Sequence, residues 1–261
     1  MIYKEYLPAP DLQDKVECYW KFIIPASQSE SAKPIPHIVL PHGCSELVFI
    51  KLLAINQELI VFKGTSTSKF TVDVFPDAIY AGIRLKPGHS KWLCAAPVEE
   101  LLNERLLYPP ADWHSWQKDL IGQISAEMDI QGLLNAALLD WKGEIGYQPH
   151  ERINLVTNRI VSDRGKTSII ELADLACLSV RQLQRVFKQE TGMSIKQFSQ
   201  IKKLRHAILQ LYFKQQNQNE MIVDHDYTDL SHFYKSFRNI AQYKLEDFFK
   251  YIDLIDHQQI V

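Results

Sequence analysis

The chain has 261 residues, of which 46% are hydrophobic and 23% charged, and its formal net charge is −2. These values are ordinary for a globular protein, and they exclude a disordered chain and one that is basic throughout. The length allows two domains with cores of their own. The overall charge hides an asymmetry, because residues 1–150 carry a formal −5 and residues 151–261 a formal +3. A basic segment behind an acidic domain favours a nucleic-acid-binding module attached to a regulatory one.

The cysteines and the apolar segments indicate a cytoplasmic protein. Cys18, Cys44, Cys94 and Cys177 form no CxxC pair and no zinc-finger spacing, so we expect reduced thiols in the core. The opening residues, MIYKEYLPAP, lack the apolar centre of a signal peptide. No apolar run approaches the ~20 residues that a membrane span needs.

Residues 1–110 are predicted to be mostly β-strand. Glu17–Ile24 is rich in aromatic residues, and a polar loop, Pro25–Pro36, follows it. Further short apolar segments, separated by Pro, Gly, Asn and Asp, are residues 37–41, 46–50, 58–64, 70–76 and 78–85. This pattern is typical of a sandwich or a small barrel. After Pro97 we expect a helix over residues 98–107, because two acids follow the proline in the first turn.

Three polar residues among these strands are candidates for an effector pocket: His42, Glu46 and Arg84. Arg84 lies within an apolar strand, so its charge requires either an anionic ligand or a protein acid such as Glu46. His42 and Glu46 match part of a metal-binding pattern. However, Leu40 stands where a second histidine is needed, and we expect no metal or other cofactor.

Two apolar stripes between residues 119 and 141 predict a pair of helices, divided at Gly132. These helices either cover the β-rich domain or pair with a second subunit. The segment Trp141–His150 has two glycines, one proline and no apolar periodicity. We therefore expect two domains, 1–145 and 146–261, with a helix over Glu151–Ser162 opening the second.

The segment from Ser168 to Ala207 predicts a helix-turn-helix unit followed by a further helix. The first helix has an apolar face at helical spacing, formed by Ile169, Ile170, Leu172, Ala173 and Ala176. Cys177 and Leu178 form the turn, and Ser179 is the expected N-cap of the second helix.

The second helix of this unit has two distinct faces. Leu183, Val186 and Phe187 are expected in the core. The opposite face carries three cations, one amide and no acid, namely Arg181, Gln184, Arg185 and Lys188. Such a face suits a helix in a DNA major groove, since arginine pairs with guanine and glutamine with adenine. The alternative is an ordinary solvated helix face, because helix-turn-helix spacing alone is common.

An internal repeat supports DNA binding. The sequence LQRVFK at Leu183–Lys188 recurs as FYKSFR at Phe233–Arg238, fifty positions later. A repeat of this kind indicates a duplicated unit. Two such units could place two reading helices on one face of a duplex, one helical turn of ~34 Å apart.

The segment from about Ile153 to Asp253 resembles the AraC/XylS-type DNA-binding domain, in which a long helix joins two helix-turn-helix units. The matching residues are Leu172, Ala173, Leu178, Ser179, Leu183, Arg185, Phe187, Lys188, Thr191, Gly192, Ser194, Leu204, Ala207, Ser231, His232, Phe233, Lys235, Phe237 and Arg238. The resemblance implies a transcription regulator. Its base-facing positions would be Arg181, Gln184, Arg185, Ser231, Tyr234 and Lys235. The residues expected on DNA phosphates are Ser179, Lys188, Lys196, Lys202, Lys203 and Arg238.

The chain departs from that family in both turns, where Cys177 and Asp226 replace the usual glycine. Ile222 replaces a small alanine and should push its helix away from its neighbour. Charge also differs between the units, because residues 166–214 carry a formal +6 and residues 215–261 a formal −4. Since phosphate contacts dominate DNA affinity, we expect the first unit to bind DNA and the second to be weakened.

The N-terminal half resembles the domain of unknown function that often precedes AraC-type segments and, more loosely, a cupin-like barrel. The residues that carry this resemblance are Leu40–Phe49 and Ala81–Gly88. It implies a sensing domain with a pocket for a small-molecule effector, and dimerisation through this half.

The sequence therefore predicts an α+β protein with a β-rich sensing or dimerising domain and an all-α double helix-turn-helix domain. The favoured function is sequence-specific binding of double-stranded DNA in response to an effector. The alternative is a protein of the same fold whose second unit is degenerate and which acts as a small-molecule-binding or protein-interaction module. No phosphate loop, nucleophile elbow, dinucleotide fingerprint or HExxH motif indicates an enzyme.

Overall fold

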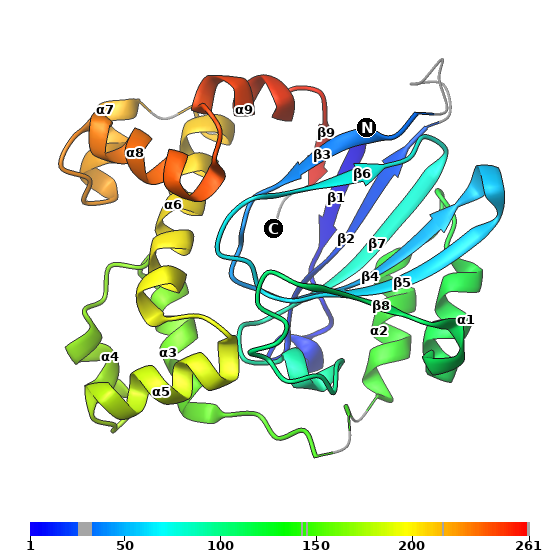
Figure 1. Cartoon of the computed structure of the whole chain (residues 1–261), viewed down its shortest axis with the longest axis horizontal. Helices are drawn as coiled ribbons and strands as arrows, with labels where there is room; N and C mark the ends of the chain where they lie inside the picture. Colours follow the sequence, from blue (N-terminus) through cyan, green and yellow to red (C-terminus); the bar gives the residue numbers. More distant parts are fainter. Residues whose placement is uncertain (26–32, 142, 145, 216, 260–261) are drawn as a thin grey trace.

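A computed structural model describes residues 1–25, 33–141, 143–144, 146–215 and 217–259. A β-rich half lies beside a helical half (Figure 1). The strands are β1 (Ile2–Tyr6), β2 (Val16–Ile24), β3 (Ile35–Val39), β4 (Glu46–Leu52), β5 (Gln57–Lys63), β6 (Phe70–Val74), β7 (Ala78–Leu85), β8 (Arg105–Tyr108) and β9 (Asp256–Gln259). The helices are α1 (Ser115–Gln123), α2 (Ile130–Leu139), α3 (Glu151–Ser162), α4 (Ile169–Leu175), α5 (Val180–Thr191), α6 (Ile195–Phe213), α7 (Gln218–Asp224), α8 (Leu230–Ala241) and α9 (Leu245–Ile252).

Seven strands form one sheet in the order β8-β5-β4-β7-β2-β1-β9, and β3 pairs with β6 in a separate ribbon. Successive side chains of a strand point to opposite faces, and both faces of the main sheet bury apolar side chains. Leu47, Phe49 and Tyr19 pack against α1 and α2, which confirms that these helices cover the sheet. Trp20 and Phe22 belong to the opposite face, toward the β3–β6 ribbon. The predicted class, a β-rich domain ahead of an all-α domain, is confirmed.

Two predicted helical features were wrong. Residues 98–103 form turns, and 105–108 form strand β8 instead of the end of a helix. Pairing with β5 captures this backbone, so a tertiary contact overrides local helix propensity. The break between the connecting helices falls before Asp129 and not at Gly132. Asp129 caps α2 by accepting a hydrogen bond from the Gly132 backbone at 3.1 Å, which places the glycine inside the helix.

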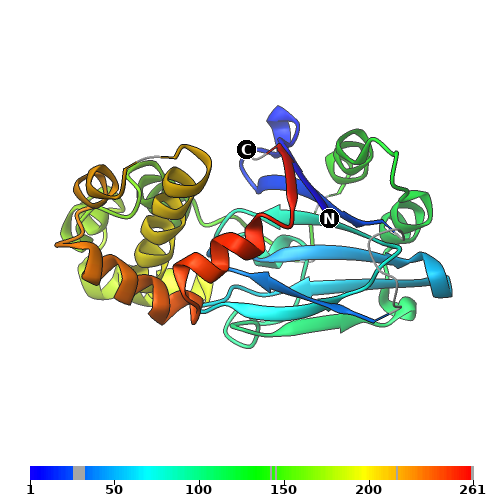
Figure 2. The ribbon, with the colours of Figure 1, turned by 90° about the horizontal axis from the view of Figure 1, so that it is seen from above.

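The last strand that the structure describes lies in the same sheet as the first. Strand β9 follows α9 and pairs in parallel with β1, and the Asp256 backbone N–H donates to the Met1 carbonyl at 2.8 Å. Figure 2 shows this last segment running from the helical half to the edge of the sheet. The expected boundary at residue 145 lies outside the described residues, as do residues 26–32 of the expected Pro25–Pro36 loop. The return of β9 means that a fragment from residue 151 onward would lose the partner of its last strand.

The helical half contains two helix-turn-helix units joined by α6. Ser168, Ser179 and Ser194 cap α4, α5 and α6 through reciprocal capping boxes. Both turns use the left-handed conformation that glycine usually supplies, with φ of 51° at Cys177 and 50° at Asp226. Cys177 is exposed, so the expectation of four core thiols was wrong at this position.

Candidate nucleic-acid interface and interdomain cavity

Helix α5 presents the surface expected of a reading helix. Leu183 and Phe187 are fully buried against α4 and α6, which fixes the rotation of the helix about its axis. The opposite face is exposed and carries Arg181, Gln184, Arg185 and Lys188. The structure therefore places these four side chains together on one solvent-exposed face of the helix.

Helix α8 repeats this arrangement with a different surface. Phe233 and Phe237 are buried, and the exposed side carries Ser231, Lys235 and Arg238. Tyr234 is half-buried, because its ring packs against Phe233 with centroids 5.7 Å apart. Tyr234 therefore offers less of its side chain to a duplex than the other expected base-facing residues.

Two acids of the second unit have structural partners. The Asp226 carboxylate lies 3.5 Å from the Lys166 ammonium, and its backbone carbonyl accepts a hydrogen bond from Lys203 at 3.1 Å. Asp229 caps α8, accepting from the His232 backbone at 2.7 Å. The negative charge of Asp229 still stands at the N-terminus of a reading helix, where the first unit has the neutral Ser179.

The expected phosphate contacts divide into two groups. Lys188, Lys196 and Arg238 are exposed, and Ser179 is exposed at its cap. Lys202 is instead only 7% exposed, and its Nζ lies 3.2 Å from Glu17 Oε1 of β2. Lys202 therefore does not belong to the phosphate surface, because it joins the two halves. Lys203 is half-buried, with its ammonium 4.5 Å from the centre of the Tyr227 ring.

A cavity of about 420 Å³ lies between the sheet, the β3–β6 ribbon and helices α6 and α9. Its walls are mostly aliphatic and aromatic. The sheet contributes Trp20, Phe22 and Ile50, and the helical half contributes side chains such as Leu204 and Ile208. The sequence predicted an effector pocket in the N-terminal half but not its place between the two halves, because the walls come from segments as far apart as Tyr3 and His257.

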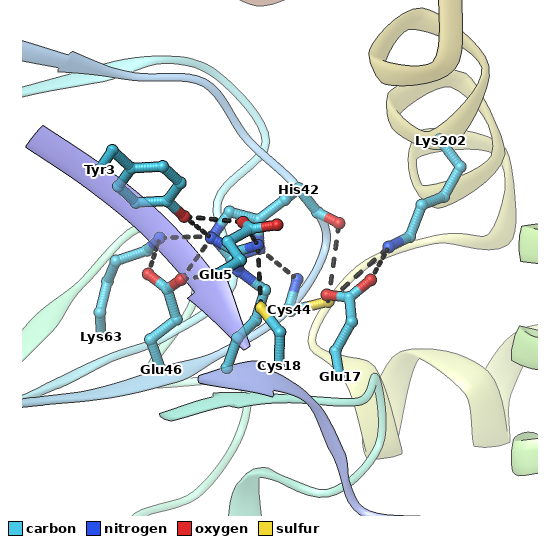
Figure 3. A network of polar contacts seen from close by, with 10 residues as sticks. Tyr3, Glu5, Glu17, Cys18, His42, Cys44, Glu46, Lys63 and Lys202 are labelled. Carbon is cyan, nitrogen blue, oxygen red and sulfur yellow. Dashed lines mark hydrogen bonds and ion pairs between the residues drawn. The ribbon is translucent and has the colours of Figure 1, made fainter. Parts of the chain in front are cut away.

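The three predicted effector residues all line this cavity and belong to one polar network. Figure 3 shows His42 and Glu46 in this network. Arg84 binds Glu46 and Glu5, each at 2.8 Å, and Lys63 binds Glu46 at 2.9 Å. His42 lies 2.9 Å from Lys63. The expectation that Arg84 pairs with a protein acid is thus what the structure shows.

Burial and charge fix the ionisation of this network. Burial alone would raise the pKa of Glu46, but Lys63, His42 and Arg84 hold that pKa well below its usual range. Burial lowers the pKa of His42 to about 3, with Lys63 adding to the shift, so His42 is neutral near pH 7. Because these groups satisfy one another, a ligand meets a closed network.

Arg205 was not among the predicted site residues, although it also lines the cavity. It is half-buried on α6. Burial favours the neutral form of Glu5, whose pKa is nevertheless lowered by Arg84 and by Arg205. Arg205 follows the buried Leu204 and lies three positions from both Lys202 and Ile208, which are also buried. This helical spacing is a weak sequence signal for a residue that faces the cavity.

The fold and the exposed cationic helix are those of a two-domain protein with a helix-turn-helix module. Comparison with protein families agrees, since residues 172–251 match a family described as "Helix-turn-helix domain" and residues 4–107 match "Domain of unknown function (DUF6597)". The chain carries an AraC-type helix-turn-helix domain, the DNA-binding module of transcription regulators, behind an N-terminal domain of that second family.

Several solved structures of ToxT from Vibrio cholerae are similar in fold. One covers 84% of this chain and 95% of its own, with 8% identity and a TM-score of 0.48. A second, bound to (E)-4-(8-methylnaphthalen-1-yl)but-3-enoic acid, covers 84% and 96%, with 8% identity and a TM-score of 0.48. A third, of the wild-type protein with an unsaturated fatty acid bound, covers 84% and 91%, with 9% identity and a TM-score of 0.47. The chain matches none of the curated proteins with which it was compared.

No helix in the described part of the chain is both long and apolar enough to cross a membrane.

Proposed function

We propose that the protein is a sequence-specific transcription regulator in which the first helix-turn-helix unit supplies most of the DNA affinity. The observation that carries this proposal is the exposed face of α5, where Arg181, Gln184 and Arg185 stand together with a neutral serine at the cap. These three side chains would contact bases, while Lys188 and Lys196 would contact phosphates.

The second unit would contribute less. Ser231, Tyr234 and Lys235 would face bases, and Arg238 a phosphate, but Tyr234 is half-buried and Asp229 is charged. An acid at the start of a reading helix repels the phosphates that helix N-termini otherwise attract. This asymmetry keeps the alternative function open, in which the fold serves a small-molecule or protein partner and duplex binding is lost.

The effector would be a small, largely apolar molecule bound in the interdomain cavity. Apolar walls and a few convergent polar groups are the usual features of a ligand site. Since Glu46 and Glu5 already pair with Arg84 and Lys63, Arg205 is the cation best placed for an acidic group on such a molecule.

The DNA proposal is tested by the salt dependence of binding to random duplex DNA. The full-length chain is required because β9 belongs to the sheet. A log–log slope is about −0.9 per phosphate neutralised, so a slope worth roughly 2 or 3 phosphates would show that the first unit acts alone. A slope worth roughly 5 or more would show that both units engage. No measurable binding would favour the alternative function.

Base reading is tested on duplexes selected from a random pool by the wild-type protein. Arg185→Ala should cost ~1–3 kcal/mol on the selected site and blunt its preference over random DNA. Lys235→Ala is the matched change in α8 and should cost less. An Arg185→Ala protein that binds as selectively as wild type would contradict the assignment.

The effector site is tested with 1-anilinonaphthalene-8-sulfonate, an apolar anion whose fluorescence rises on burial. We expect saturable binding of one probe per chain. Ile208→Trp should abolish it, because the larger side chain would fill the cavity that Ile208 lines. Leu139→Trp is the control, since Leu139 is exposed on α2 and lies outside the cavity wall.

A further inference from the structure

One loop of the β-rich half contacts the C-terminal ends of both reading helices. This loop, residues 64–69, joins β5 to β6. The Thr65 hydroxyl donates to the carbonyl of Thr191, the last residue of α5, at 3.1 Å. The Lys69 backbone N–H donates to the carbonyl of Ile240, one residue before the end of α8, at 2.9 Å. Two helices that belong to separate units thus rest on a segment of six residues.

The same loop begins and ends at the cavity. Lys63 precedes it and Phe70 follows it, and both side chains line the cavity. The Lys63 ammonium lies 4.7 Å from the centre of the Phe70 ring, and it also binds Glu46 at 2.9 Å. A molecule that enters the cavity therefore contacts Lys63 and Phe70, the two residues that flank the loop.

The loop is also hydrogen-bonded to residues 103 and 104, which precede strand β8. The Gly64 backbone N–H donates to the Glu104 carbonyl at 3.1 Å, and the Asn103 backbone N–H donates to Thr65 at 2.8 Å. The Asn103 side chain accepts from the Thr67 backbone at 2.9 Å. Since Gly64, Thr65 and Thr67 are all bonded to these two residues, we expect a displacement at one end of the loop to reach the other end.

We propose that the 64–69 loop transmits the occupancy of the cavity to the two reading helices and sets their spacing. A ligand that displaces Lys63 or Phe70 shifts Thr65 and Lys69, and these carry the ends of α5 and α8 with them. DNA binding responds because two reading helices must match successive major grooves, one turn of ~34 Å apart. This inference rests on the effector response proposed above and assigns Thr65 and Lys69 as positioning residues.

Reciprocal linkage gives the sharpest test. If occupancy of the cavity alters DNA affinity, bound DNA must alter ligand affinity by the same factor. The probe is 1-anilinonaphthalene-8-sulfonate, and its Kd is measured on the full-length protein with and without the duplex selected by wild type. In the wild-type protein we expect the two Kd values to differ by about fivefold or more.

The test variant combines Thr65→Val, which removes the hydroxyl at nearly constant shape, with Lys69→Pro, which removes the backbone donor. We expect this variant still to bind the probe in the absence of DNA and to bind DNA in the absence of the probe. The ratio of its probe Kd values with and without DNA should be near one. The matched control combines Thr65→Ser with Lys69→Ala, which keep both donors, and it should retain the wild-type ratio. Thr65→Val alone, which leaves the backbone unchanged, should lower the ratio and serves if the proline variant does not fold.

The possible failures are distinguishable. A wild-type protein whose probe affinity is unaffected by DNA would overturn the effector response, and with it the role of the loop. A normal wild-type ratio that persists in Thr65→Val and in the double variant would overturn the loop alone. In that case the proposed DNA and effector sites would stand, and another contact between the halves would couple them.

Discussion

Lys202 of α6 and Glu17 of β2 form an ion pair across the boundary between the two halves, with Nζ and Oε1 3.2 Å apart. The Cys44 thiol donates to the other carboxylate oxygen of Glu17 at 2.9 Å. Burial would raise the pKa of Glu17, yet the charge of Lys202 and its other neighbours keep that pKa well below its usual range. A lysine on the long helix of the helix-turn-helix domain thus fixes that helix to the β-rich half.

Lys202→Met should therefore lower the stability of the protein without lowering its affinity for DNA. Removing one partner of a buried pair leaves the other charge uncompensated, and we expect a loss of about 2–3 kcal/mol because Glu17 retains some exposure. Lys196→Met, an exposed change on the same helix, should alter stability by no more than about 0.5 kcal/mol. Urea unfolding measures both effects.

The salt slope of DNA binding separates the same two lysines. Lys196→Met should reduce the slope by about 0.9, the value for one phosphate contact, and Lys202→Met should leave it unchanged. A reduced slope in Lys202→Met would return this residue to the phosphate surface.

His89 should make stability fall as the pH is lowered below about 6.5. The side chain is 1% exposed, and its Nε2 lies 3.0 Å from Asn154 of α3. Burial lowers the pKa of His89 to about 4. Between pH 6.5 and 4 the unfolded chain therefore binds a proton that the folded chain excludes, and the free energy of unfolding decreases by up to about 3 kcal/mol.

The measurement is the urea midpoint of wild type and His89→Gln between pH 7 and pH 4.5. The wild-type midpoint should drop more steeply than that of the variant, because glutamine does not titrate. His37 and His42, whose pKa values burial lowers to about 4 and about 3, act in the same direction in both proteins. Parallel pH profiles would show that folding does not shift the pKa of His89.

Local patterns predicted what local physics determines. The spacing of Leu183 and Phe187 predicted the buried face of α5, and hence the exposed arginines opposite. The short apolar run of residues 78–85 predicted β7. By contrast, Asp256–Gln259 is polar and only four residues long, and it becomes a strand because β1 lies beside it. The role of Lys202 could not be predicted either, because in the sequence it resembles Lys196 as a cation on a basic helix. Only its contact with the distant Glu17 distinguishes the two lysines.

Gly64→Ala should disturb the 64–69 loop directly. A Cβ atom on residue 64 would lie 1.8 Å from the Leu101 carbonyl oxygen, so the backbone of one segment must move. We expect a loss of about 1–3 kcal/mol, as for other overpacked sites. Gly122→Ala is the control because nothing lies within 4 Å of its added methyl group, and the exposed end of α1 should gain about 0.5–1 kcal/mol. Equal melting temperatures for the two variants would show that the loop tolerates displacement freely.

Exchanging the caps of the two reading helices should move DNA affinity in opposite directions. Asp229→Ser keeps a side-chain acceptor at the N-terminus of α8 while it removes a negative charge, and Ser179→Asp does the reverse at α5. Each change alters the interaction of a helix N-terminus with phosphate by about 0.3–1 kcal/mol. We therefore expect Asp229→Ser to bind random duplex DNA about two- to fivefold more tightly at low salt, and Ser179→Asp to bind it more weakly by a similar factor. Both differences should shrink as salt is raised, because exposed charges are screened. If Asp229→Ser leaves affinity unchanged while Ser179→Asp lowers it, the N-terminus of α8 does not approach the phosphates, and the second unit acts as a structural support for the first.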